Sequence, residues 1–145
     1  EQGYQPLAYA GWPLNPEVGM LKVPVVQALV EMGADACAQS VSGITPLHAV
    51  SRMWGEKYPD YSAEVLHLFV KHGADINIKD SSGRASLHVA AGSGFEKTVR
   101  LLLQLGARID DKSEDDRTPL HWAAIGGHAR LVCIANRRAH MSTKP

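Results

Sequence analysis

Dense apolar runs recur along the chain, and each one ends in a glycine followed by an alanine. The runs are VVQALVEMGAD (25–35), VLHLFVKHGAD (65–75) and TVRLLLQLGAR (98–108). In the third run, Leu101, Leu102 and Leu103 lie between further apolar residues and would cover most faces of a helix. Such a helix must be buried between neighbours. The terminal glycines suit the left-handed conformation that ends many helices, so the pattern predicts three buried helices.

A second pattern precedes each of these runs. Its copies are GYQPLAYA (3–10), GITPLHAV (43–50) and GRASLHVA (83–90), with a fourth, DRTPLHWA, at 116–123. Thr45-Pro46 and Thr118-Pro119 combine an N-cap hydroxyl with a proline at the first helical position, where the missing amide costs nothing. Small residues such as Ala90 and Ala123 follow, which allows close helix approach. The pattern therefore predicts a short first helix in each unit.

The two patterns together resemble the ankyrin repeat. The interval from His88 to His121 equals one period of that family. The resemblance implies an all-α solenoid of about four helix-turn-helix units joined by short β-hairpins. The expected units are 3–39, 40–79, 80–112 and 113–141, forming one domain over 1–141 with a disordered tail at 142–145. Because one helix pair cannot bury its own apolar face, stacking of the units would form the core.

The first two units are each seven residues longer than this period. Leu47 and Val65 are farther apart in the sequence than the equivalent pair, Leu87 and Thr98. The excess therefore lies between the two helices. One added turn per helix would keep both apolar faces in phase. The alternative is a protruding loop, which the helix-breaking prolines favour. These are Pro13, Pro16, Pro24 and Pro59.

The second insertion carries an aromatic cluster. Trp54, Tyr58 and Tyr61 lie within a short polar stretch. Tyrosine and tryptophan are enriched at protein interfaces, so the cluster is one candidate partner contact. The alternative is a local core in which the rings pack on the neighbouring unit.

Composition narrows the functional classes. The 145 residues include 15 Lys+Arg and 15 Asp+Glu, which argues against general nucleic-acid binding. An apolar fraction of 45% argues against disorder, and no apolar run approaches the ~20 residues that a membrane span requires. Two cysteines, Cys37 and Cys133, indicate a reducing compartment, so we expect a cytoplasmic or nuclear location. Since the chain starts at Glu1 rather than Met, we expect a fragment.

Candidate catalytic groups fit no known arrangement. Among the seven histidines, none follows a zinc-binding spacing, and no nucleophile or phosphate-binding motif is present. We therefore expect no enzyme activity, no metal and no cofactor. The ankyrin resemblance implies that His48, His88 and His121 are structural. We expect both cysteines to be small buried residues.

Two polar features remain open. Asn77 occupies the position that asparaginyl hydroxylases modify in some ankyrin domains, so it is a candidate hydroxylation site. Asparagine is also a common structural choice at that position. The acidic run Asp110–Asp116 lacks the spacing of a calcium-binding loop, and we expect it to be a solvated hairpin tip that could attract a basic partner segment.

The resemblance implies a non-enzymatic protein-interaction module that binds another protein or peptide on its concave face. The family's variable positions map onto Ile44, Arg84, Arg117, Ala49, Val89, Trp122, Arg52, Ser93 and Ile125. Trp122 with Arg84 and Arg117 is the expected centre, because tryptophan and arginine dominate binding energies. The alternative position for Trp122 is the edge of the stack.

We expect the chain to be a monomer that neither enters a membrane nor binds nucleic acid. An alternative function is the targeting or substrate-recognition part of a larger protein. Such a protein could be a ubiquitin-ligase adaptor, a channel with a cytoplasmic domain or a secreted bacterial effector.

Overall fold

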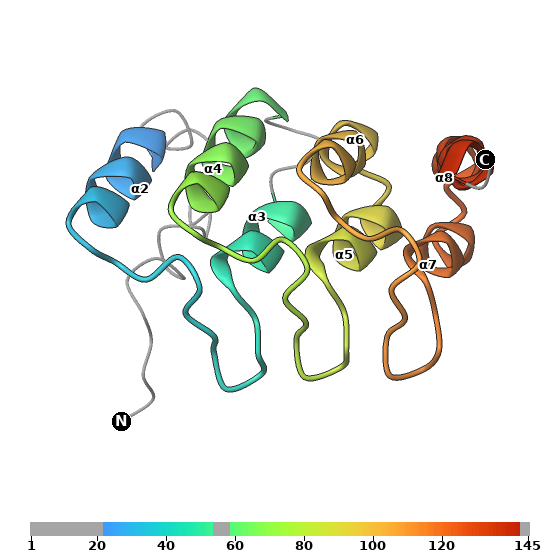
Figure 1. Ribbon diagram of the computed structural model, residues 1–145, viewed down its shortest axis with the longest axis horizontal. Coiled ribbons are helices and arrows are strands. Elements are labelled where there is room, and N and C mark those ends of the chain that lie inside the picture. Colours follow the sequence, from blue (N-terminus) through green and yellow to red (C-terminus); the bar gives the residue numbers. More distant parts are fainter. Residues whose placement is uncertain (1–21, 54–58, 143–145) are drawn as a thin grey trace.

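The computed structural model describes residues 22–53 and 59–142. It contains the helices α2 (Lys22–Glu31), α3 (Pro46–Met53), α4 (Pro59–Lys71), α5 (Ser86–Ser93), α6 (Glu96–Gln104), α7 (Pro119–Ile125) and α8 (Ala129–Ser142). Figure 1 shows them in two layers, with α2, α4, α6 and α8 above α3, α5 and α7. The fold is the all-α repeat array that the sequence predicts.

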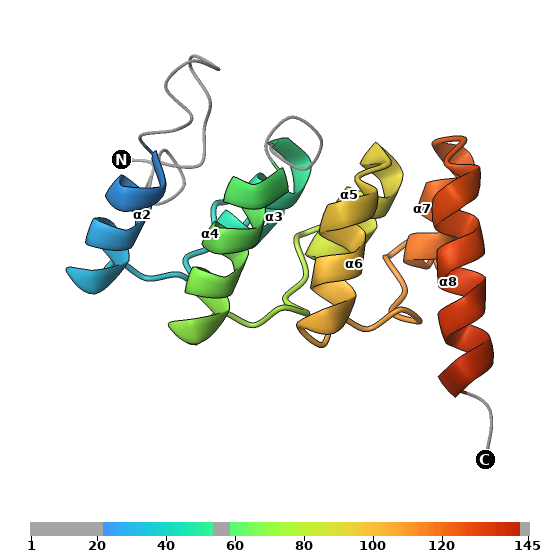
Figure 2. The same ribbon diagram turned by 90° about the horizontal axis from the view of Figure 1, so that it is seen from above.

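Contacts between helices run along the array and within each unit. The first helices pack in the row α3–α5–α7, and the second helices α2, α4 and α6 pack in a parallel row. Figure 2 shows the rows from above, with the pairs α3/α4, α5/α6 and α7/α8 side by side. Stability in such an array comes mainly from contacts between adjacent units.

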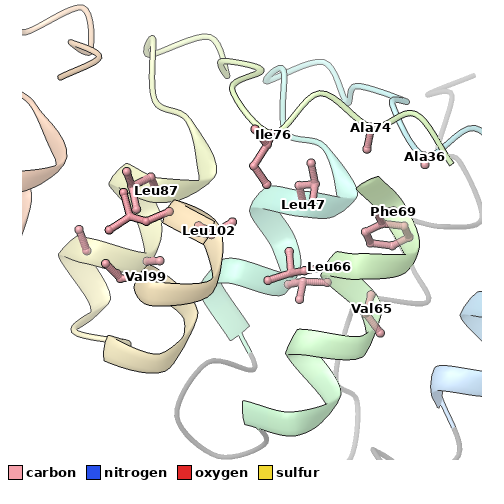
Figure 3. Packing of buried hydrophobic residues seen from close by; sticks show 14 of the residues in the cluster. Ala36, Leu47, Val65, Leu66, Phe69, Ala74, Ile76, Leu87, Val99 and Leu102 are labelled. Atoms are coloured by element: carbon pink, nitrogen blue, oxygen red, sulfur yellow. The ribbon is translucent and has the colours of Figure 1, made fainter. Parts of the chain in front are cut away.

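One apolar core continues through the array. Leu47 of α3, Phe69 of α4 and Leu102 of α6 are each at most 1% exposed, and Figure 3 shows them in one cluster of buried hydrophobic side chains. Burying one such side chain fully is worth about 1.5–3 kcal/mol. An apolar cavity of about 20 Å³ lies between α5, α6, α7 and α8, and Ala135 lines it.

Three hairpin-shaped connections are described, around Ser42, Ser82 and Glu114, and the second and third each stack on the one before. Ser81 N–H donates to Ser42 O, and Glu114 N–H donates to Ser82 O, both at 3.0 Å. Within the described residues these connections contain turns closed by backbone hydrogen bonds rather than β-strands. The expected β-hairpins therefore keep their path but lack regular strand pairing.

Gly83 is required at its hairpin for two reasons. Its φ is +69°, and an added Cβ would lie 2.7 Å from Glu114 N of the next hairpin. Asp116 has the same left-handed backbone, with φ +56°, although it is not glycine. Aspartate tolerates this conformation better than most residues. In the described part of the chain, no further hairpin stacks on Asp116.

The second insertion lengthens the second helix. Helix α4 has 13 residues and α6 has 9, whereas α3 and α5 both have 8. The expectation that Pro59 favours a loop is wrong, because Pro59 begins α4, where its missing amide costs nothing. Pro24 likewise lies in the first turn of α2. Residues 54–58 and the first insertion up to Leu21 lie outside the described residues.

Two further expectations need correction. Helix α8 continues through Ser142, so the expected disordered tail at 142–145 overlaps the end of a helix, and 143–145 lie outside the described residues. Cys133 is exposed on α8, and Cys37 is only partly buried, so neither is a core residue. The Cys37 thiol donates a weak hydrogen bond to Gly73 O at 3.4 Å.

Candidate functional site

His48 connects its own unit to the next one. Its Nδ1 accepts from the Thr45 N–H at 3.2 Å and from the Thr45 hydroxyl at 2.8 Å. That pattern leaves the proton on Nε2, which donates to Arg84 O at 2.8 Å. Burial lowers the pKa of the His48 imidazole, although the hydrogen bond to Arg84 opposes this shift. The neutral ring therefore holds two loops together.

His88 repeats this arrangement one unit later. Its Nδ1 accepts from the Ala85 N–H at 3.1 Å, and its Nε2 lies 2.9 Å from Asp111 O and 3.2 Å from Arg117 O. Burial again lowers the pKa of the imidazole, against the two backbone hydrogen bonds. His121 makes the local contact with Thr118 at 2.8 Å and is exposed. These geometries suit structural residues rather than acid–base catalysts.

Arg84 is held in place at the base of the second described hairpin. Asp80 accepts from Arg84 Nε at 3.0 Å and lies 2.9 Å from Nη2. The Asp80 side chain is 3% exposed and that of Arg84 is 37% exposed. Burial alone would raise the pKa of Asp80, but hydrogen bonds from the backbone and side chain of Arg84 hold that pKa below its usual value. The pair fixes the guanidinium at the surface.

The structure brings Arg84 and Trp122 together. The guanidinium carbon lies 5.8 Å from the centre of the indole ring, within range of a cation–π contact. The six-membered ring of the indole packs on α5, where a Cβ added to Gly92 would lie 3.5 Å from the indole Cε3. The indole Nε1 is buried and has no hydrogen-bond partner among the described residues. Trp122 therefore joins the third and fourth units and is half-buried.

Other predicted positions lie on the second, third and fourth units. Arg117 is exposed at the start of the fourth unit, Ile125 is 62% exposed and Ile44 is 36% exposed. We call the surface that is expected to bind a partner the inner face. It comprises Ile44, Arg52, Arg84, Val89, Arg117, Trp122 and Ile125. The expected position Ser93 is wrong by one residue, because Gly92 is the residue that aligns with Arg52 and Ile125 at the repeat spacing.

Of the aromatic cluster, only Tyr61 belongs to the described residues. Tyr61 lies on α4, in the layer of second helices, and is partly buried. Trp54 and Tyr58 lie outside the described residues. Whether the cluster contacts a partner stays a prediction.

Asn77 uses both ends of its amide to join the second and third units. Its Nδ2 donates to Gly106 O at 3.2 Å, and its Oδ1 accepts from Arg108 N at 2.8 Å. Cys37 is the equivalent residue one unit earlier and makes only the weak bond to Gly73 O. Asn77 thus has a structural role, and its hydroxylation stays a prediction.

Sequence reasoning missed His128, which joins the last two units. Its Nε2 lies 3.1 Å from Gly92 O, and a Cβ on Gly126 would lie 2.6 Å from the ring. A Cβ on Gly94 would also collide with the imidazole. The sequence signal that could have revealed this contact is a pair of glycines in adjacent units, Gly94 and Gly126. Both leave space for the His128 ring.

The comparison with protein families agrees with the geometry. The family model for ankyrin repeats (three copies) matches residues 18–113 and 57–141. The chain belongs to the ankyrin repeat family. Ankyrin repeats are generally protein-interaction modules rather than enzymes, and they bind other proteins.

Relatives share the repeat over part of their length. The chain is 38% identical over 84 residues to the mouse B-cell lymphoma 3 protein homolog, covering 57% of this chain and 17% of that protein. It is 43% identical over 63 residues to the probable protein S-acyltransferase 23 of Arabidopsis thaliana, covering 43% of this chain and 11% of that protein. It is 36% identical over 66 residues to human protein phosphatase 1 regulatory subunit 27, covering 46% of this ankyrin chain and 38% of that protein.

Among residues 22–53 and 59–142, no group of three or more His, Cys, Asp or Glu residues is arranged to hold a metal ion. In the same part of this ankyrin array, every helix is too short or too polar to span a bilayer.

Proposed function

We propose that the inner face binds another protein or peptide. The observation that carries the proposal is the stacked pair of Arg84 and Trp122, with the exposed Arg117 and Ile125 in the same repeat unit as Trp122. Arginine and tryptophan recur at the centres of protein interfaces. Asp80 holds Arg84 in one orientation before binding, which reduces the entropy that a partner must overcome.

The inner face also fits a particular kind of contact. Ile125 supplies apolar area and Arg117 supplies hydrogen-bond donors, and both side chains are exposed. Arg84 is already paired with Asp80, so its charge is partly neutralised. A partner segment with an apolar side chain beside a hydrogen-bond acceptor would match this surface.

Substitutions on two exposed faces test the proposal. A partner is first identified by crosslinking with mass spectrometry, and its affinity is then measured by calorimetry with purified proteins. We expect Ile125→Ala and Arg117→Ala each to weaken binding about five- to tenfold, because central interface residues cost more than about 1 kcal/mol. Met32→Ala is the matched control, since Met32 is 84% exposed directly after α2, outside the inner face.

Trp122→Ala should weaken binding more than Ile125→Ala or Arg117→Ala does. The melting temperature of the Trp122→Ala variant must be checked, because the indole ring also packs on Gly92. The proposal fails if Ile125→Ala and Arg117→Ala both bind with wild-type affinity, or if Met32→Ala has the larger effect.

A second candidate is recognition on behalf of a longer protein. The chain covers between 11% and 38% of three relatives, so in those proteins the matching segment is one part of a longer chain. The full coding sequence tests this candidate. A catalytic, membrane or adaptor segment beyond the array would support it, and a chain limited to ankyrin units would refute it.

A further inference from the structure

Asp80 shows how a negative charge stabilises one hairpin. Its Oδ1 accepts from the backbone N–H groups of Ser82 and Arg84, both at 2.9 Å. Its Oδ2 accepts from the Arg84 guanidinium at 2.9 and 3.0 Å. The carboxylate therefore joins the first residue of the turn to two amides and to the arginine four residues later. Such charge-assisted hydrogen bonds are the strong ones in proteins.

Ser113 occupies the equivalent position in the last described hairpin, one repeat later. The backbone bonds are the same: Asp80 N–H donates to Arg84 O at 2.9 Å, and Ser113 N–H donates to Arg117 O at 2.9 Å. Ser113 is 6% exposed, and its Oγ is buried without a hydrogen-bond partner among the described residues. The third hairpin, which contains Ser113, thus has the same closing backbone hydrogen bond as the second. The serine hydroxyl stands where the second hairpin has the Asp80 carboxylate.

The surroundings of Ser113 include cations. Arg117 corresponds to Arg84 and is exposed. The Lys79 ammonium donates to Lys112 O at 2.9 Å, one residue before Ser113. Lys112 lies 3.6 Å from Asp116 in a surface ion pair, with side chains 62% and 86% exposed. A phosphate dianion on Ser113 would have Lys112 and Arg117 in its own hairpin and Lys79 in the preceding one.

The residues after Ser113 are acidic and exposed. Glu114, Asp115 and Asp116 occupy the next three positions. A serine followed by three carboxylates matches the substrate charge pattern of acidophilic serine/threonine kinases, whose substrate grooves are basic. The matched serine, Ser40, is followed by Val41, Ser42 and Gly43. Its Oγ already accepts from Ile44 N at 3.1 Å.

We propose that Ser113 is a phosphorylation site and that its phosphate takes the place of the Asp80 carboxylate in the third hairpin. The Ser113 Oγ attacks the γ-phosphorus of ATP bound to an acidophilic kinase. The new O–P bond forms as the bond to the β,γ-bridging oxygen breaks, ADP leaves, and a base of the kinase takes the hydroxyl proton. The phosphate then accepts from the amides of Asp115 and Arg117 and from the Arg117 guanidinium.

Kinase access requires local opening of this hairpin. Among the described residues it stacks on one neighbouring hairpin only, through the Glu114 N–H bond to Ser82 O. The preceding unit also holds its backbone through Lys79 and His88, which bond Lys112 O, Asp111 O and Arg117 O. It lacks the four side-chain bonds that Asp80 makes in the second hairpin. Segments with few such bonds open at low free-energy cost. The third hairpin can therefore expose its serine by a local opening.

Phosphorylation would also change the inner face. Arg117 is an exposed cation there, and a phosphate on Ser113 would draw its guanidinium down and neutralise it. This consequence alone rests on the proposed function. The modification and its effect on stability can be tested without any partner, so failure of one proposal is distinguishable from failure of the other.

The experiment treats the folded full chain with a purified acidophilic serine/threonine kinase and Mg·ATP. Mass spectrometry maps the product in the wild type, in Ser113→Ala and in Ser40→Ala. We expect one phosphate on Ser113, retained in Ser40→Ala and lost in Ser113→Ala. A synthetic peptide spanning 107–119 is the positive control. Phosphorylation of that peptide without modification of Ser113 in the folded chain would overturn the proposal.

Thermal melting tests the hairpin contacts. We expect the phosphorylated chain to melt about 3–6 °C higher than the unmodified chain, as charge-assisted hydrogen bonds are added. Ser113→Asp should raise the melting temperature in the same direction, and Arg117→Gln should remove most of either gain. Ser40→Asp is the matched control, with a smaller rise, because Ile44 replaces the arginine. An unchanged or lower melting temperature on phosphorylation would also overturn the proposal.

Discussion

Acidification should destabilise this protein because two neutral imidazoles support the array from inside. His48 and His88 are 3% and 1% exposed, and burial lowers the pKa of both rings from 6.5. Below that pH the unfolded chain takes up protons at these residues before the folded chain does. The free energy of unfolding therefore falls as the pH decreases from about 7.5, and the stabilising contribution is fully present only above about that pH.

The magnitude follows from the difference in bound protons. Between about pH 7.5 and pH 5.5, a ring that stays neutral when folded and titrates at about 6.5 when unfolded costs about 1.4 kcal/mol. Both rings together cost at most about 2.7 kcal/mol, a large share of a typical stability of about 5–15 kcal/mol. The loss per ring is smaller if the folded ring takes up its proton within this range.

Urea unfolding followed by circular dichroism measures this loss. The free energy of unfolding is determined at pH 7.5, 6.5 and 5.5 for the wild type, His48→Gln and His88→Gln. Each variant is less stable at pH 7.5 because its inter-unit hydrogen bonds change, so the comparison uses the slope against pH. We expect each variant to lose up to about half of the contribution from these two rings.

His67→Gln is the matched control, because His67 is exposed on α4 and lies between no pair of units. It should retain the steep dependence that the buried rings cause. A wild-type stability that stays constant or rises from pH 7.5 to pH 5.5 would refute the reasoning. Slopes that are the same in the wild type, His48→Gln and His88→Gln would refute it as well.

Three substitutions test the packing of the repeats by thermal or urea unfolding. Cys37→Asn should stabilise the fold by about 1 kcal/mol, because the new amide can make the two bonds that Asn77 makes one unit later. Ala135→Leu should stabilise it by roughly 0.5–1.5 kcal/mol by filling the apolar cavity between the last two units. Gly83→Ala should destabilise it by at least about 2 kcal/mol, since it combines a left-handed φ with a contact to Glu114 N.

Each of these predictions has a control or a contrary outcome. Cys37→Ala lacks the amide and should not gain stability. A lower stability of Ala135→Leu would mean that the cavity cannot accept a larger side chain. Gly73→Ala tests the backbone cost alone, because its φ is +89° and nothing lies within 4 Å of an added Cβ. Equal losses in Gly73→Ala and Gly83→Ala would contradict the role given to hairpin stacking.

Much of the fold could be predicted because its signals are local. The Thr-Pro pair begins α7 at Pro119, and α6 ends at Gln104, just before Gly106. The insertion was harder, since seven residues between helices fit either a protruding loop or one added turn in each helix. The structure shows the extra turn at the start of α4, with Pro59 as its first residue.

The candidate site could be predicted less fully. The repeat register placed Arg84 and Trp122 on adjacent units, but their 5.8 Å contact depends on Asp80 holding the guanidinium and on Gly92 leaving room for the ring. His128 belongs to no repeat motif, and its position between two glycines depends on how the fourth unit stacks on the third. Pairwise contacts of this kind join residues that lie far apart in the sequence, so local patterns do not reveal them.

The sequence alone determined the family, the helical phase and the positions that a unit uses for its neighbours. Only the tertiary structure decided which of these positions are covered. Val25 and Val65 hold equivalent places, yet Val25 is 52% exposed at the start of the described array and Val65 is fully buried on α4, which packs between α2 and α6. His88 and His121 differ in the same way. Helix formation follows local chemistry, whereas burial depends on which unit stands next to it.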